Sequence, residues 1–136
     1  MSNIEIKDPL DLKIEFLEFD ERQYSIKLFL NYFVVVFQKK LIEINNQLWV
    51  ECKMWDEFIL NIYKMKIRES KVAKLYSMSD ELILELFKEE DSFSFILHYN
   101  RYVNPNVNIN SSISSTLNVE QLDYLYRHLN SFDKCW

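Results

Sequence analysis

The sequence contains no glycine in 136 residues, although proteins of average composition contain about 7% glycine. Glycine adopts positive φ most readily, and asparagine and aspartate tolerate it next best. We therefore expect any position with positive φ in this chain to be occupied by Asn or Asp. The absence of glycine also excludes the glycine-rich loops that hold phosphate groups in nucleotide-binding proteins.

The segment from Leu48 to Met65 changes its hydrophobic period partway along. Leu48, Val50 and Cys52 lie on one side of an alternating pattern, which is typical of a strand. From Lys53 onward, apolar residues recur every three or four positions, which predicts a helix with one apolar face. These residues are Trp55, Phe58, Ile59, Ile62 and Met65. A strand that leads directly into such a helix allows the helix to pack across a sheet.

Most of the remaining chain also alternates between apolar and polar residues. Residues 1–11 are predicted to be a polar lead-in. Further strands are expected at about residues 12–19, 24–37, 41–44, 47–52, 72–77, 81–88, 92–100 and 107–117. Asn45-Asn46 is expected to form a two-residue hairpin turn, and the stretch Asn100 to Asn106 is expected to be a loop.

The last predicted strand leads into a second helix. Asn118 is suited to cap its N-terminus, and Gln121, three residues later, completes a capping box. An apolar stripe follows, formed by Val119, Leu122, Leu125, Tyr126, Leu129 and Phe132. The whole pattern predicts a single α+β domain over residues 1–136. We expect a mostly antiparallel sheet of six to eight strands with two helices packed on one face.

The composition limits the kinds of partner that the chain can bind. Its net charge of −5 argues against nucleic acid, which is bound by clustered Lys and Arg. The longest apolar run is too short to span a bilayer, and the acidic N-terminal segment does not resemble a signal peptide. We therefore expect a cytoplasmic protein with neither nucleic acid nor membrane as a partner. The charge is compatible with a basic partner protein.

Few residues are placed to carry catalysis or to bind a metal. His98 and His128 have no Cys or carboxylate at the spacing of a metal site. Cys52 falls on the same side of its predicted strand as the apolar residues, so a buried small side chain is favoured over a nucleophile. Cys135 does not lie in a sequence motif typical of a nucleophile. Residues 111–115 are rich in serine but lack the glycines of a nucleophile elbow. We expect neither enzymatic activity nor a metal or cofactor.

Two sets of residues are candidates for contact with a partner. Acidic residues are concentrated within 8–21 and 80–91; such runs are most often solvated, but they can also attract and orient a cationic protein. Aromatic and aliphatic residues also fall on the sheet face opposite the predicted helices. Three interpretations are open. Loops could cover that face, or the assignment of inward and outward residues could be wrong by one position. Alternatively, the face could bind a partner or a second copy of the chain. The selected residues are Glu18, Glu21, Phe29, Phe33, Phe87, Glu89 and Glu90.

From Trp49-Val50-Glu51 onward, the sequence resembles the WapI-like family of bacterial immunity proteins. The resemblance continues with Met54 and Phe58 on the following helix and extends over about residues 12–132 as a pattern of apolar positions. Its later part includes Ala73-Lys74-Leu75, Glu81-Leu82-Ile83-Leu84, Asn118 and Leu122. The resemblance implies a small binding protein without catalytic residues that occludes a cognate toxin, often a nuclease.

The favoured function is therefore a non-enzymatic immunity protein that neutralises a toxin domain, itself expected to be basic. The alternative is a homodimeric structural or adaptor domain that binds another protein through its apolar sheet face. An enzyme that uses scattered carboxylates is the third interpretation, and the sequence offers no nucleophile, metal site or phosphate loop in its support.

Overall fold

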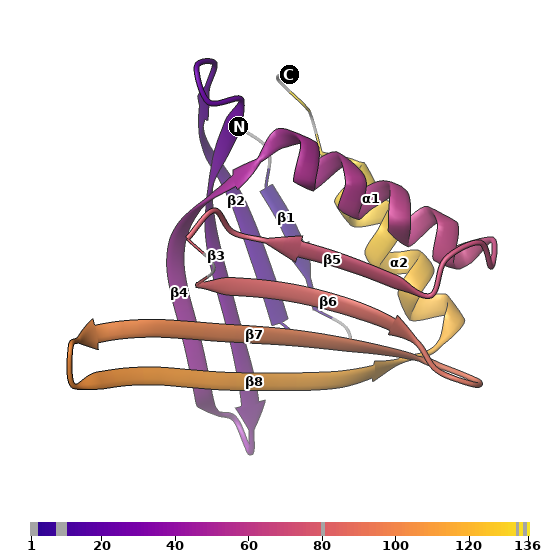
Figure 1. The fold of residues 1–136 in the computed structure, drawn as a ribbon. Helices are drawn as coiled ribbons and strands as arrows, with labels where there is room; N and C mark the ends of the chain where they lie inside the picture. The colour runs from indigo at the N-terminus through magenta and orange to yellow at the C-terminus, as the bar shows by residue number, and fades with distance from the viewer. Residues whose placement is uncertain (1–2, 8–10, 80, 133, 135) are drawn as a thin grey trace.

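The computed structural model describes residues 3–7, 11–79, 81–132, 134 and 136. Four strands and a helix are followed by four more strands and a second helix (Figure 1). The first half comprises β1 (Asn3–Ile6), β2 (Asp11–Asp20), β3 (Ser25–Val36), β4 (Lys39–Glu51) and α1 (Cys52–Lys66). The second half comprises β5 (Val72–Tyr76), β6 (Leu82–Lys88), β7 (Phe93–Asn104), β8 (Val107–Leu117) and α2 (Val119–Asn130).

The strands form two four-stranded antiparallel sheets. Sheet A has the order β1-β2-β3-β4 and sheet B the order β5-β6-β7-β8, so strands pair with their neighbours in the sequence. The predicted α+β class with two helices is confirmed, but the prediction of a single sheet is wrong. Alternation identifies strands without specifying where the pairing stops. Here α1 separates β4 from β5, and β5 begins a new sheet.

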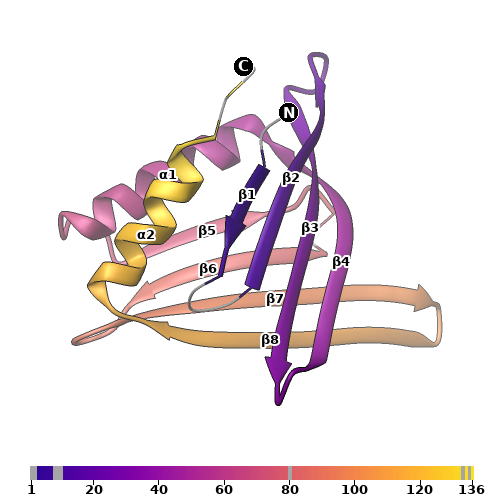
Figure 2. The ribbon, with the colours of Figure 1, turned by 180° about the vertical axis from the view of Figure 1, so that it is seen from behind.

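The two sheets cross with their buried faces toward each other (Figures 1 and 2). From sheet A, Leu28, Leu30 and Tyr32 of β3 are each 1% exposed. From sheet B, Phe95 and Leu97 of β7 are 3% and 0% exposed and belong to the same hydrophobic core. Because side chains alternate between the two faces of a strand, the remaining residues of each sheet point outward. The molecule therefore presents two outer sheet faces, directed away from each other.

The two helices lie side by side along one margin of the sheets (Figure 1). Most of the predicted stripe of α1 is buried, with Trp55, Phe58, Ile62 and Met65 at most 2% exposed, whereas Ile59 is partly buried. Among the strands, α1 packs mainly against β5, whereas α2 packs mainly against β1, and the two helices also contact each other. Each helix thus contacts the first strand of the other half of the chain. The helices fill the open margin between two sheets, so the expectation that both cover one face of one sheet is corrected.

Strand β1 lies in the segment predicted to be a polar lead-in. Ile4 and Ile6 pair with Ile14 and Leu12 of β2 and are 3% and 1% exposed. Two alternating apolar residues are too few to establish a period in the sequence. The burial of β1 depends on the distant helix α2, which no local pattern indicates.

The β3–β4 turn is formed by Phe37 and Gln38, so the prediction of a turn at Asn45-Asn46 is wrong. Phe37 has φ of 52° and Gln38 has φ of 64°, and they connect the paired residues Val36 and Lys39. Positive φ at both central residues is the pattern of a type I′ turn, which matches the twist of the flanking strands.

Asn45 and Asn46 instead lie within β4, opposite Asn31 and Leu30 of β3. The side chain of Asn45 accepts a hydrogen bond from Asn31, and Asn46 Nδ2 donates one to Glu81 Oε2 at 3.1 Å. These amide side chains therefore make tertiary contacts, which the local turn signal does not take into account.

Positive φ also occurs at Tyr24, at 51°, and at Arg68, at 63°. None of the Asn and Asp residues that the structure describes has positive φ, so the expectation from the absence of glycine is wrong. A left-handed conformation costs about 1–2 kcal/mol in a residue with a Cβ. Surrounding contacts offset this cost at Tyr24, whose carbonyl accepts a hydrogen bond from the Cys52 N–H at 3.0 Å and whose ring packs against Phe19.

Replacing Phe37-Gln38 with Asn-Gly is expected to raise the free energy of unfolding by about 1–2 kcal/mol, because Asn-Gly suits a type I′ turn far better. The measurement is equilibrium denaturation in urea. The matched control, Asn46→Gly within β4, is expected to lower stability by about 0.5–1 kcal/mol. A destabilising Asn-Gly turn would contradict the positive φ of both residues.

Strands β7 and β8 extend past the rest of sheet B as a two-stranded ribbon, the β7–β8 arm (residues 100–110; Figure 1). The predicted loop from Asn100 to Asn106 is therefore corrected: β7 reaches Asn104, and only Pro105 and Asn106 form the turn. Asn104 Oδ1 accepts a hydrogen bond from the Asn106 N–H at 2.9 Å. Frequent asparagines made this segment resemble a loop, although its backbone pairs with β8 as far as Asn104, with one irregularity between Tyr102 and Asn104.

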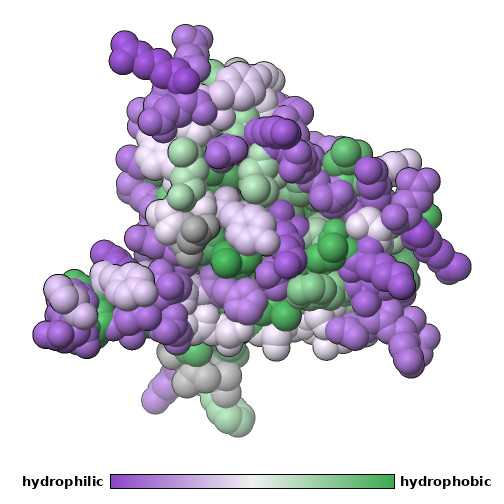
Figure 3. All heavy atoms as spheres, viewed as in Figure 1, coloured by the Kyte–Doolittle hydropathy of each residue, from purple (hydrophilic) through white to green (hydrophobic). Residues whose placement is uncertain are grey.

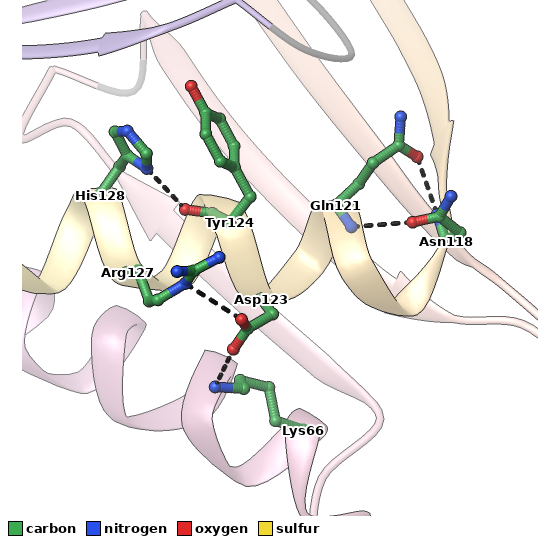
Figure 4. A network of polar contacts seen from close by, with 7 residues as sticks. All are labelled: Lys66, Asn118, Gln121, Asp123, Tyr124, Arg127 and His128. Atoms are coloured by element: carbon green, nitrogen blue, oxygen red, sulfur yellow. Dashed lines mark hydrogen bonds and ion pairs between the residues drawn. The ribbon is translucent and has the colours of Figure 1, made fainter.

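Helix α2 begins with the predicted capping box (Figure 4). The Gln121 N–H donates to Asn118 Oδ1 at 2.8 Å, and the Asn118 N–H donates to Gln121 Oε1 at 2.9 Å. These two bonds satisfy backbone donors that have no partner within the helix.

Asn118→Ala is expected to lower the free energy of unfolding by about 1 kcal/mol, and Asn118→Gly by only a few tenths. Thermal and urea denaturation of both variants provide the measurement. Asn110→Ala on the exposed arm is the control and is expected to be neutral. Equal stability of Asn118→Ala and the wild type would contradict a contribution of the cap.

Candidate protein-binding surface

The structure places the seven candidate partner-binding residues on two different sheets. Glu18, Phe29 and Phe33 lie on sheet A, and Glu21 lies in the turn that joins β2 to β3. Phe87 lies on sheet B, at the end of β6, and Glu89 and Glu90 follow in the β6–β7 turn. Because the outer faces of the sheets point away from each other, the seven residues do not form one continuous surface.

The outer face of sheet A carries a short aromatic row on its third strand. Phe29 and Phe33 are partly exposed and lie four residues apart on β3. Phe29 is paired with Glu15 of β2, and Phe33 is paired with Asp11 of β2 and Glu43 of β4. Each ring therefore has a carboxylate on at least one adjacent strand.

Acidic side chains predominate on this face. Its carboxylates are those of Glu5, Asp11, Glu15, Glu18, Glu43 and Glu51, and the ammonium groups of its described side chains include those of Lys7, Lys13 and Lys27. Lys13 Nζ lies 2.8 Å from Glu15 Oε1, and this hydrogen bond raises the pKa of Lys13. Lys27 Nζ lies 6.0 Å from the centre of the Trp49 ring. The face therefore has an excess of negative charge around exposed aromatic carbon.

We call this surface the aromatic–acidic face and define it by Asp11, Glu15, Glu18, Phe29, Phe33, Glu43 and Trp49. Sheet A faces the viewer in Figure 2, and no helix or strand of the described residues crosses in front of β2, β3 and β4 there. Leu48 and Val50 lie on the buried side of β4, so the alternation of the strand places Trp49 on this outer face.

The outer face of sheet B is also partly apolar, but its charges are balanced. Apolar atoms over the middle of the sheet are interrupted by polar ones (Figure 3). Lys74 Nζ lies 3.6 Å from one oxygen of Glu85, and His98 Nε2 lies 3.4 Å from the other. Lys74 also lies 5.8 Å from the centre of the Phe87 ring. Phe87 therefore has a basic neighbour on a face where opposite charges are paired.

The histidines and the described cysteine occupy structural positions. His128 Nδ1 lies 2.8 Å from the carbonyl oxygen of Tyr124 in the preceding turn of α2 (Figure 4). Cys52 is completely buried at the start of α1, as its parity predicted, and Cys135 lies outside the described residues. Among the described residues, no group of three or more His, Cys, Asp or Glu side chains could hold a metal ion.

The β7–β8 arm exposes apolar side chains that the sequence patterns did not indicate. Tyr102 is 73% exposed, and Val103, Val107 and Ile109 are each about half exposed. On β8, residues 107, 109, 111, 113 and 115 alternate, which was the signal for a strand. That signal gives no information about how far the rest of the sheet extends, so it could not identify these residues as solvent-exposed.

No family model and no curated protein matches the sequence. A solved structure of MRP1/MRP2 from Trypanosoma bruciei is similar, with a TM-score of 0.45 and 9% sequence identity. The similarity covers 96% of this chain and 79% of that chain, and it is too low to indicate function. None of the helices in the described residues is long and apolar enough to cross a membrane.

Proposed function

We propose that the chain is a non-catalytic binding protein that holds a basic toxin domain against its aromatic–acidic face and neutralises it by occlusion. The observation that carries the proposal is the partly exposed row of Phe29 and Phe33 with carboxylates on the strands beside it. Carboxylates speed the encounter with a cationic protein and orient it, and aromatic rings that become buried slow its dissociation.

The choice of a toxin as the partner is supported by the sequence pattern that begins at Trp49-Val50-Glu51, which resembles that of immunity proteins. Trp49 and Glu51 both lie on the outer side of β4, beside the aromatic row. A toxin that is a nuclease would present basic residues, because it must bind phosphate groups. Its basic surface would complement the excess of carboxylates on sheet A.

A symmetric homodimer through this face is less favourable. Such an interface pairs the same patch of two subunits, which would bring the carboxylates of both copies together. Like charges placed opposite each other across an interface weaken association.

Charge reversal tests the electrostatic part of the proposal. Glu18→Lys with Glu21→Lys should slow association with the toxin domain and reduce its dependence on salt, because these residues lie at the margin of the face. Glu89→Lys with Glu90→Lys changes the net charge equally but lies on sheet B, and it should have the smaller effect. The association rates are measured by stopped flow. The partner in these measurements is the product of the gene immediately upstream of the gene for this chain, where the toxin is expected to be encoded.

Truncation of the aromatic rings tests the contact itself. Phe33→Ala should speed dissociation by about thirtyfold or more, which corresponds to about 2 kcal/mol at a residue that contributes strongly to binding. Phe87→Ala on sheet B is the matched control and should leave dissociation unchanged.

Two results would overturn the assignment of the face. An equal effect of both charge-reversal pairs would mean that only the net charge of the chain matters. Faster dissociation with Phe87→Ala but not with Phe33→Ala would place the interface on sheet B. Circular dichroism of each variant establishes that the fold is intact.

A further inference from the structure

A cavity of about 570 Å³ lies where the end of α1, the start of α2 and the β6–β7 turn meet. We call it the helix-end pocket. It is lined by Met65, Lys66, Arg68, Lys88, Phe93, Val119, Glu120, Leu122, Asp123 and Arg127. Met65, Phe93 and Leu122 belong to the hydrophobic core and form an apolar floor. The volume falls within the range of about 300–1,000 Å³ that is typical of small-molecule sites.

The charge of the pocket is opposite to that of the chain. Four of the lining residues are basic and two are acidic, although the net charge of the chain is −5. Asp123 is already engaged: Lys66 Nζ lies 2.5 Å from one of its oxygens and Arg127 Nε lies 3.0 Å from the other (Figure 4). The hydrogen bond from Lys66 is the main cause of the lowered pKa of Asp123. Asp123 therefore remains ionised and is shared by two cations.

The other two cations of the pocket, Arg68 and Lys88, have no carboxylate partner among the described residues. The Arg68 residue is exposed at the end of α1 and forms no ion pair with the residues that the structure describes. Lys88 Nζ lies 3.5 Å from the carbonyl oxygen of Glu90 and 4.7 Å from the centre of the Phe93 ring. One cation above a buried ring and one guanidinium without a carboxylate partner thus border an apolar floor.

We propose that the helix-end pocket binds a small organic carboxylate with an apolar body, such as a medium-chain fatty acid. Arg68 can hold a carboxylate through two parallel hydrogen bonds, and Lys88 supplies a second positive charge. The hydrocarbon chain lies on Met65, Phe93 and Leu122, where its burial contributes to affinity. The carboxylate of Glu120 at the pocket favours a monoanion over a dianion such as phosphate.

The site is independent of the proposed toxin contact, because the two lie on different parts of the molecule. The aromatic–acidic face belongs to β2, β3 and β4, whereas the pocket belongs to the helix ends and the β6–β7 turn. Binding of a carboxylate can therefore be tested on the full chain without any partner protein.

The test measures the affinity for decanoate by isothermal titration calorimetry, below the concentration at which decanoate forms micelles. Saturable binding at one site is expected. Decanol, which has the same chain length but no charge, is expected to bind at least about tenfold more weakly, as is expected when hydrogen bonds to a charged group are lost. Inorganic phosphate is expected not to bind.

Arg68→Gln and Lys88→Gln are each expected to lower the affinity for decanoate by about tenfold or more. Lys53→Gln is the matched control, because Lys53 lies at the opposite end of α1 with 81% of its side chain exposed, and it should bind as the wild type does. Methyl resonances of Met65 and Leu122 should shift on binding, which locates the ligand.

The proposal is overturned by any of three results. Equal affinity for decanoate and decanol would show that charge plays no part. Equal losses in Arg68→Gln and Lys53→Gln would show a response to net charge rather than to a site. Absence of saturable decanoate binding to the folded wild type, or binding of phosphate instead, would also contradict it.

Discussion

Phe58→Ala is expected to lower the free energy of unfolding by about 3–5 kcal/mol. Phe58 is 1% exposed on the inner side of α1, within the core that both sheets share. Its removal takes away apolar contacts and leaves a cavity that the strands on both sides cannot fill without shifting. A domain of this size has only about 5–15 kcal/mol of stability to lose.

The control for this prediction is Leu60→Ala on the same helix. Leu60 is 50% exposed, so its truncation should cost far less than that of Phe58. Urea denaturation of the two variants gives the comparison. Equal costs, or a melting temperature of Phe58→Ala within a degree or two of the wild type, would mean that the buried side of α1 is wrongly assigned.

The second large effect is expected at Ile6 in the short strand β1. Ile6 is 1% exposed and pairs with Leu12, and the strand is covered by α2. Ile6→Ala should therefore cost about 2–5 kcal/mol, although the sequence pattern predicts a polar lead-in at this position.

Glu5→Ala provides the adjacent control, since Glu5 is exposed and its side chain points to the outer side of sheet A. It should change stability by no more than about 0.5 kcal/mol. If Ile6→Ala is as harmless as Glu5→Ala, β1 does not contribute to the core in solution.

Elements whose signal is local could be predicted from the sequence. The alternation of β3 and the three- and four-residue spacing of α1 each persist over ten or more residues, so the correct residues were assigned to the core. The cap at Asn118 was predictable because its partner Gln121 lies only three positions away. The division into two sheets was not, because it depends on which strands pair across long separations.

The candidate surface shows the same limit. Parity placed Phe29, Phe33 and Trp49 on one outer face, because these residues lie on paired strands with alternating burial. The same reasoning grouped Phe87 with them, but Phe87 lies on the other sheet. Alternation shows which face of its own sheet a residue occupies, and it does not show which sheet that is. The helix-end pocket could not be predicted, because Arg68, Lys88 and Arg127 come from segments that only the tertiary fold brings together.

Each helix packs against the first strand of the other half of the chain, so the two halves are expected to fold together. Residues 3–66 include four strands and a helix, yet the strand that α1 contacts most is β5, and the strand that α2 contacts most is β1. A half formed alone would leave much of the apolar stripe of its helix in water, because α1 and α2 make fewer contacts with β4 and β8 of their own halves. Structure that forms before α2 has been synthesised is therefore expected to have little stability. Both sheets are expected to form in one cooperative step. A cut between α1 and β5 would give two fragments, each of which needs the other to fold.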